Sequence, residues 1–195
     1  MRRLDLVIGP NGAGKSTFVR LTLSRVLPPG AAFVNADEIA ARRWPEDPQR
    51  NAYRASRVAA ETRLALMEAG QSFIAETVFS HPSKLELVDA AHAAGYDVFL
   101  HVLLVPEELA VARVARRVAS GGHPVPEERI RQRYRRLWGL VASAMTRAEA
   151  ATAYDNSGAE GPRIVAQLAH GVAVGAVTWP DWAPVELRGA WPRSD

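Results

Sequence analysis

The stretch Gly9-Pro10-Asn11-Gly12-Ala13-Gly14-Lys15-Ser16 has the pattern of a phosphate-binding loop: a glycine, four residues, then Gly-Lys-Ser. The apolar residues 4–8 before it are typical of a buried strand, and residues 15–26 after it are typical of an amphipathic helix. Glycines let backbone N–H groups approach phosphate oxygens, and the helix directs its positive end at the anion. The order strand, loop, helix is the context that gives this motif its meaning.

This loop predicts ATP and Mg²⁺ as cofactors. Lys15 has the length to reach the β- and γ-phosphates, and the hydroxyl of Ser16 is placed to hold Mg²⁺. The predicted cofactor contacts are the loop, the first helical residues and one arginine farther along the chain: Gly9, Asn11, Gly12, Ala13, Gly14, Lys15, Ser16, Thr17 and Arg113.

Length and composition favour one globular domain over residues 1–195. The chain is 48% hydrophobic and 23% charged, which are ordinary values for a soluble domain. It contains no cysteine, no apolar run of membrane-spanning length and no apolar secretory stretch near residue 1. We therefore expect a cytoplasmic protein with no membrane partner.

Strand and helix patterns alternate along the chain, which predicts an α/β fold: a doubly wound, mainly parallel sheet of the P-loop kinase type. Strands are expected near residues 4–8, 31–35, 72–75, 97–105 and 151–154. Helices are expected near residues 15–26, 37–43, 48–69, 82–94, 106–120 and 126–150. The C-terminal extension, about residues 158–195, is expected to form a β-hairpin from residues 163–168 and 172–177, or an extended tail with packed tryptophans.

Acidic side chains follow two of the predicted strands. Ligands of open α/β sheets bind beyond the carboxyl ends of the strands, so we expect Asp37, Glu76 and Thr77 to face the same crevice as Lys15. Transfer to a hydroxyl needs a carboxylate that orients it and accepts its proton, and Asp37 is the predicted catalytic residue and a substrate contact. The alternative for Asp37 is the cap of the following helix.

Glu76 and Thr77 are predicted substrate contacts, with a surface carboxylate as the alternative for Glu76. Residues 155–157, Asp-Asn-Ser, are expected after the last parallel strand. They form either a loop near the base or ribose of the nucleotide or a plain turn.

Eight of the 22 arginines lie between residues 113 and 136, although the net charge is only +3. Arg113, Arg116 and Arg117 precede Gly121-Gly122, and Arg129 and Arg133 are spaced i, i+4 on the next helix. Two such helices joined by a flexible break predict a lid, about residues 113–136, with Arg117 and Arg133 as catalytic phosphate clamps. A solvated helix surface is the alternative. The cluster lacks interleaved aromatic residues, which argues against nucleic acid.

Taken together, these motifs resemble the zeta-toxin family of P-loop kinases, in its short bacterial UDP-N-acetylglucosamine-kinase-like branch. The matching segments, in the family's order, are residues 9–17, Asn-Ala-Asp-Glu-Ile-Ala at 35–40, Ala-Glu-Thr at 75–77, Gly-Gly-His-Pro-Val-Pro-Glu-Glu at 121–128, Arg-Tyr at 133–134 and Tyr-Asp-Asn-Ser at 154–157. The Gly-Gly-His segment and the Asp-Asn-Ser ending are the most specific of these.

The resemblance implies ATP-dependent phosphorylation of a sugar hydroxyl on a UDP-activated amino sugar, and an antitoxin protein as partner. It implies Asp37 as catalytic base, Lys15 and Ser16 as phosphate and metal groups, Glu76 as a substrate contact, and Arg117 with Arg133 as clamps. The chain departs from the family where Glu76-Thr77-Val78 replaces Glu-Gly-Thr.

Two alternatives stay open on the residues themselves. One is a kinase for another hydroxyl, such as an antibiotic, a nucleoside or a polynucleotide end. The other is an ATP-binding regulatory module that transfers nothing.

Overall fold

The structure, a computed structural model, describes residues 1–23, 31–122 and 124–194. The strands are β1 (Arg2–Ile8), β2 (Ala32–Val34), β3 (Phe73–Thr77), β4 (Tyr96–Leu104), β5 (Ala150–Asp155), β6 (Arg163–Ala169) and β7 (Val172–Ala173). The helices are α1 (Lys15–Leu21), α2 (Ala36–Arg43), α3 (Ala52–Glu68), α4 (Ser83–Ala93), α5 (Glu107–Ala119), α6 (Glu127–Arg147) and α7 (Val185–Ala190).

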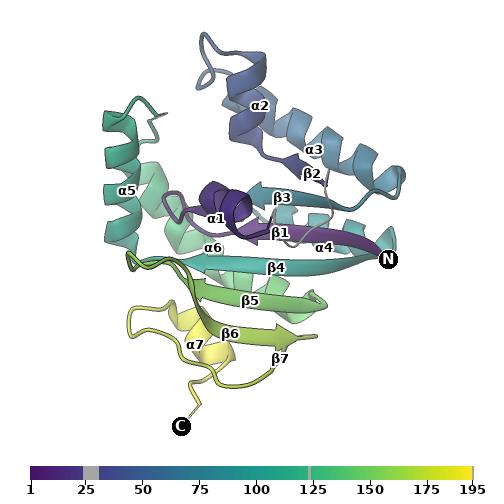
Figure 1. The fold of residues 1–195 in the computed structure, drawn as a ribbon, viewed down its shortest axis with the longest axis vertical. Helices are drawn as coiled ribbons and strands as arrows, with labels where there is room; N and C mark the ends of the chain where they lie inside the picture. The colour runs from purple at the N-terminus through teal and green to yellow at the C-terminus, as the bar shows by residue number, and fades with distance from the viewer. Residues whose placement is uncertain (24–30, 123, 195) are drawn as a thin grey trace.

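The strands form one sheet in the order β2-β3-β1-β4-β5-β6-β7 (Figure 1). All pairings among the first five strands, β1 to β5, are parallel. At one edge of the sheet, β6 pairs antiparallel with β5, and β7 pairs antiparallel with β6. The prediction of a mainly parallel α/β sheet is confirmed. Parallel strands end at the same edge, so the phosphate-binding loop after β1 and the residues after β3 are neighbours.

Helices cover both faces of the sheet, with α1 on one face and α4 and α6 on the other (Figure 1). Successive side chains of β1 point to opposite faces of the sheet, so the strand contributes to an apolar layer on each face. Leu4, Leu6 and Ile8 belong to the larger apolar cluster with residues of α3, α4 and α6, whereas Val7 packs with Phe18 of α1.

Several element bounds differ from the sequence-based expectations. Helix α1 ends at Leu21 rather than near residue 26. Residues 24–26 of the expected helix lie outside the described residues, and so does His123 of the expected Gly-Gly-His segment. Strand β3 continues through Thr77, so Glu76 is a strand residue that pairs with Val7 of β1 rather than part of a following loop. Helix α3 begins at Ala52, after a turn that spans residues 48–51.

The C-terminal extension is only partly the expected hairpin. Strand β6 pairs with β5 at the sheet edge, but β7 has two residues and residues 174–177 are not in a strand. The tail beyond it contains α7 and is therefore not fully extended. Its tryptophans are packed as expected: Trp179 is buried and donates its indole N–H to Trp191 O at 2.7 Å.

No helix among the described residues is both long and apolar enough to span a bilayer.

Candidate active site

The phosphate-binding loop connects β1 to α1 and closes tightly because its glycines have no side chain. Gly14 has φ +84°, and a Cβ there would lie 2.7 Å from Nδ2 of Asn156. A Cβ on Gly12 would lie 2.5 Å from the carbonyl oxygen of Ala110. The loop is thus a backbone cradle that side chains would fill, which fits the binding of phosphate oxygens by N–H groups.

Lys15 opens α1 and is only 7% exposed. Its ammonium donates to Pro10 O at 3.0 Å and lies 3.9 Å from Oε1 of Glu76. Burial lowers the pKa of Lys15, and the carboxylates of Glu76 and Asp37 act in the opposite direction. Arg117 and Arg133 lower the pKa of Lys15 further, so all these charges act on the same ammonium group.

Glu76 organises the polar groups beside this lysine. Its Oε2 accepts hydrogen bonds from the Ser16 hydroxyl at 2.8 Å and from Nδ2 of Asn35 at 2.7 Å. The Glu76 side chain is about 10% exposed. The alternative of a plain surface carboxylate is therefore wrong for Glu76.

Asp37 lies in the first turn of α2 with an exposed side chain. It is not the cap of that helix. Asn35 is the cap, and its Oδ1 accepts from the backbone N–H groups of Asp37 and Glu38 at 2.8 and 3.3 Å. The Asp37 carboxylate acts electrostatically on both Lys15 and Arg133, raising the pKa of each against the effect of burial.

The arginines of α5 and α6 have different surroundings. Arg133 donates from Nη1 to Oδ1 of Asn11 at 3.4 Å, and burial lowers the pKa of Arg133. Arg113 donates to the carbonyl oxygens of Asn156 and Ser157, so it braces the loop after β5. Arg117 acts on Lys15 electrostatically.

The break between α5 and α6 begins with a hydrogen-bonded helix end. Gly121, at φ +85°, donates to Val118 O at 2.9 Å, and Gly122 donates to Arg117 O at 2.9 Å. This is a Schellman ending of α5. A Cβ on Gly122 would lie 2.6 Å from Cγ of Arg117, so the glycine lets the chain pass close to that arginine.

Two of the predicted contact residues, Thr77 and Thr17, have local or exposed surroundings. The Thr77 hydroxyl accepts from the backbone N–H of Phe79 at 3.4 Å, within a local turn, and Thr17 is exposed on α1. In the segment after β5 only Asn156 reaches the loop, donating to Ala13 O at 2.7 Å. Asp155 instead accepts from Ser157 and pairs with Arg163.

The roles of three residues near the site were not predicted. Asn35 and Asn156 each bridge two segments through a side-chain amide, as described above. Arg131 of α6 pairs with Glu107, Glu108 and Glu127, and its Nη2 lies 2.8 Å from Oε2 of Glu108. Arg131 thus ties the start of α6 to the start of α5, and the spacing of Glu127 and Arg131, i and i+4, was the only sequence signal.

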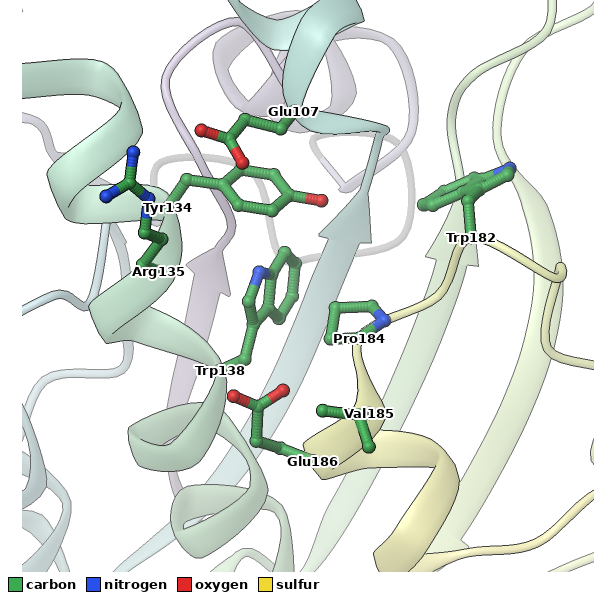
Figure 2. Close-up of a pocket in the computed structure, with 8 residues that line it drawn as sticks. All are labelled: Glu107, Tyr134, Arg135, Trp138, Trp182, Pro184, Val185 and Glu186. Carbon is green, nitrogen blue, oxygen red and sulfur yellow. The ribbon is translucent and has the colours of Figure 1, made fainter. Parts of the chain in front are cut away.

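A hollow lies between the start of α5, the helix α6 and the C-terminal tail (Figure 2). Its volume is about 270 Å³, and its lining combines aromatic and acidic side chains that include Tyr134, Trp138 and Glu186. Burial and nearby carboxylates raise the pKa of Tyr134 to about 12, and its hydroxyl donates to Val105 O at 2.9 Å. No predicted site residue lines this hollow.

Comparison with known families identifies the chain. The profile of a family described as an AAA domain matches residues 4–139, more than half of the sequence. The chain belongs to this AAA domain family. No curated protein matches its sequence.

Solved structures share the fold of this AAA domain. They include AvrRxo1-ORF1:-ORF2 with ATP (TM-score 0.68, 15% identity, 89% of this chain and 60% of that chain). Another is from the PezAT chromosomal toxin-antitoxin system of the human pathogen Streptococcus pneumoniae (0.62, 14%, 85% and 72%). A third is shikimate kinase from Acinetobacter baumannii in complex with shikimate (0.52, 20%, 74% and 80%). The chain spans 60% of the length of the first of these, and the likeness shows a shared P-loop kinase-like fold.

Proposed function

We propose that this protein is an ATP- and Mg²⁺-dependent kinase of zeta-toxin type that phosphorylates a sugar hydroxyl of a UDP-activated amino sugar such as UDP-N-acetylglucosamine. The observation that carries the proposal is the set of charges acting on Lys15. Glu76 lies 3.9 Å from this buried ammonium, and Arg133 donates to Asn11 of the phosphate-binding loop. Asp37 and Arg117 also act on the ammonium electrostatically.

In this proposal the loop residues Gly9, Asn11, Gly12, Ala13, Gly14, Lys15, Ser16 and Thr17, with Arg113, hold ATP. Ser16 holds Mg²⁺ through a hydroxyl that now donates to Glu76. Among the described residues no group of three or more His, Cys, Asp or Glu side chains could cage a metal. That suits Mg²⁺, which keeps waters and phosphate ligands and supplies neutralisation of phosphate charge when bound.

Asp37 orients the acceptor hydroxyl and takes its proton. Its exposed carboxylate is accessible to an acceptor, and the capped first turn of α2 fixes its backbone. Glu76 and Thr77 contact the acceptor side of the crevice. Arg117 and Arg133 stabilise charge on the transferred phosphoryl oxygens, as fixed cations do in phosphoryl transfer.

Mass spectrometry of UDP-sugars incubated with the protein, ATP and Mg²⁺ tests the acceptor directly. We expect UDP-N-acetylglucosamine to gain the mass of one phosphate, and the gain to vanish in Asp37→Asn. Phosphorylation of an RNA end, a nucleoside or an antibiotic, with none on UDP-sugars, would refute the acceptor while keeping the kinase chemistry.

We also propose an antitoxin protein as partner. The PezAT neighbour is described as part of a toxin-antitoxin system. Expression of the chain in bacteria is expected to arrest growth, and a protein encoded beside it is expected to relieve the arrest. Normal growth of cells that contain active enzyme would rule out this role.

A further inference from the structure

Asn35 is joined to both segments that carry the carboxylates of the crevice. It directly follows β2, whose last residue, Val34, pairs with Ala75 of β3. Asn35 therefore comes beside Glu76, the next residue of β3, and it also begins α2, whose first turn carries Asp37. The Asn35 side chain is only 5% exposed, so its polar atoms depend on partners within the protein.

Both ends of the Asn35 amide are used. Its Nδ2 donates to Oε2 of Glu76 at 2.7 Å. Its Oδ1 accepts from the backbone N–H groups of Asp37 and Glu38 at 2.8 and 3.3 Å. The direction of the amide follows from its chemistry, because only the oxygen can accept from N–H groups and only the nitrogen can donate to a carboxylate.

This double contact explains why an asparagine stands at position 35. Aspartate and serine cap helices about as well as asparagine does. An ionised aspartate could not donate to Glu76, and it would place a second carboxylate at the 2.7 Å separation that the amide now occupies. A serine hydroxyl is shorter and has a single hydrogen to donate. Helix capping alone does not require the amide, whereas the contact with Glu76 does.

The contact also matters because the other interactions of Glu76 involve groups that are proposed to bind ligands. Oε2 of Glu76 also accepts from the Ser16 hydroxyl at 2.8 Å, and Oε1 lies 3.9 Å from the Lys15 ammonium. Ser16 is the proposed metal group and Lys15 the proposed phosphate group, so both of these contacts would change when ligands bind. Asn35 is not a proposed ligand contact, and its hydrogen bond to Glu76 can persist throughout.

We propose that Asn35 is a positioning residue of this site. One amide sets the direction of the Glu76 carboxylate and fixes the first turn of α2, which carries Asp37. Asn35 acts through these two residues, the first a proposed substrate contact and the second the proposed base. The inference rests on the proposed kinase function, and its test includes a measurement that needs no turnover.

The decisive substitution is Asn35→Asp, which keeps the cap and removes the donor. Two carboxylates within hydrogen-bond distance raise the pKa of one of them, and while that proton is bound, position 35 can still donate to Glu76. We expect kcat to fall by about tenfold or more at about pH 8, as for a lost hydrogen bond to a charged group. The deficit should shrink as the pH is lowered. Lys15 and Asp37 are unchanged in this variant, so the altered pH profile reports the new pair.

Asn51→Asp is the matched control. It makes the same chemical change at the residue before α3, where Nδ2 donates to the carbonyl oxygen of Asp47 at 2.9 Å. Its kcat should match wild type at every pH. If Asn35→Asp does not fold, Asn35→Ser keeps a capping oxygen without the amide and should lose kcat by a similar factor. Wild-type kcat in whichever of these variants folds would show that Asn35 only caps α2.

Urea denaturation without nucleotide separates this inference from the kinase assignment. In Asn35→Asp the paired carboxylates have a raised pKa in the folded state, so the folded variant binds more protons than the unfolded chain and loses stability as the pH rises. Its urea midpoint should therefore fall further below wild type between about pH 5 and about pH 8, above the ordinary carboxyl range. In a Glu76→Gln background, where an amide faces the new carboxylate, this pH-dependent loss should disappear.

The two measurements can fail separately. If no acceptor accelerates turnover of the wild type, the kinase assignment fails, but a pH-dependent loss of stability that Glu76→Gln removes still supports Asn35 as the residue that holds Glu76. An equal loss in both backgrounds, or no loss in either, would overturn the inference whatever the activity of the site.

Discussion

Lys15 and Arg63 are equally buried, each 7% exposed, but their surroundings differ. Glu76 lies 3.9 Å from the Lys15 ammonium, and Asp37 adds a second negative charge. Arg63 has no such carboxylate. The contrast shows that equal burial can leave two cations in very different electrostatic surroundings. Lys15 lies beside carboxylates at the phosphate-binding loop, and Arg63, on α3, has no carboxylate among the influences on its pKa.

The largest effect on turnover is expected from removal of the exposed carboxylate near Lys15. Asp37→Asn keeps the size of the side chain but cannot accept a proton, so turnover should fall by about 10²–10⁴. ATP affinity, measured by calorimetry, should stay within about twofold of wild type because Asp37 is not a loop residue. Turnover equal to wild type would remove Asp37 from the role of base.

A smaller effect is expected when the counterion of Lys15 is removed. Glu76→Gln leaves the ammonium less compensated, and the free energy of unfolding, from urea denaturation, should fall by about 1–3 kcal/mol without nucleotide. Glu61→Gln is the control, since Glu61 pairs with Arg57 at an exposed position and should change stability by less than about 0.5 kcal/mol. Equal effects of the two substitutions would show that Glu76 does not compensate Lys15.

A change in the free energy of unfolding of the opposite sign is expected when Arg63 is replaced. In phosphate-free buffer Arg63→Met removes an uncompensated buried charge and keeps an apolar stem, so the free energy of unfolding should rise by about 1–2 kcal/mol. Arg57→Met, at an exposed position, should leave it nearly unchanged. A clear loss of stability in Arg63→Met would mean that the guanidinium makes net stabilising contacts within the fold.

The smallest effect is a pH dependence. Burial lowers the pKa of Lys15 in the folded protein below its ordinary value of 10.5. At a pH between the lowered pKa and 10.5, the unfolded chain therefore binds more protons than the folded one. The Lys15 contribution to the free energy of unfolding therefore rises with pH across that window. Urea denaturation should show this slope in wild type and a smaller one in Lys15→Met, and identical slopes would contradict the shift.

The sequence predicted the parallel sheet because its phosphate-binding loop and alternating apolar segments are local signals. It also predicted which strand ends carry Glu76 and Asp37, since the carboxyl ends of parallel strands meet. The alternative role of Asp37 as the helix cap is wrong, because Asn35 is the cap; both residue types cap helices, and only the fold selects one.

Other features depend on pairing between distant segments. The tail was expected to be a longer hairpin or an extended segment, but β7 stops at Ala173. The chain after it packs Trp179 and Trp191 into the core, and so does not continue along the sheet edge as a strand. Arg63 was not singled out because a lone arginine on a helix is usually solvated. Only the positions of Ala59 and Met67, one turn on either side, show that it faces inward.

The central claim is that the crevice around Lys15 transfers phosphate to a hydroxyl. The most direct measurement is ADP release by the wild-type protein at saturating ATP and Mg²⁺, with and without UDP-N-acetylglucosamine or another hydroxyl acceptor. The account predicts that an acceptor accelerates ADP release, with one phosphate gained on the acceptor per ADP formed. ATP binding with an ADP release rate that no acceptor changes would contradict it and would favour a regulatory nucleotide-binding module.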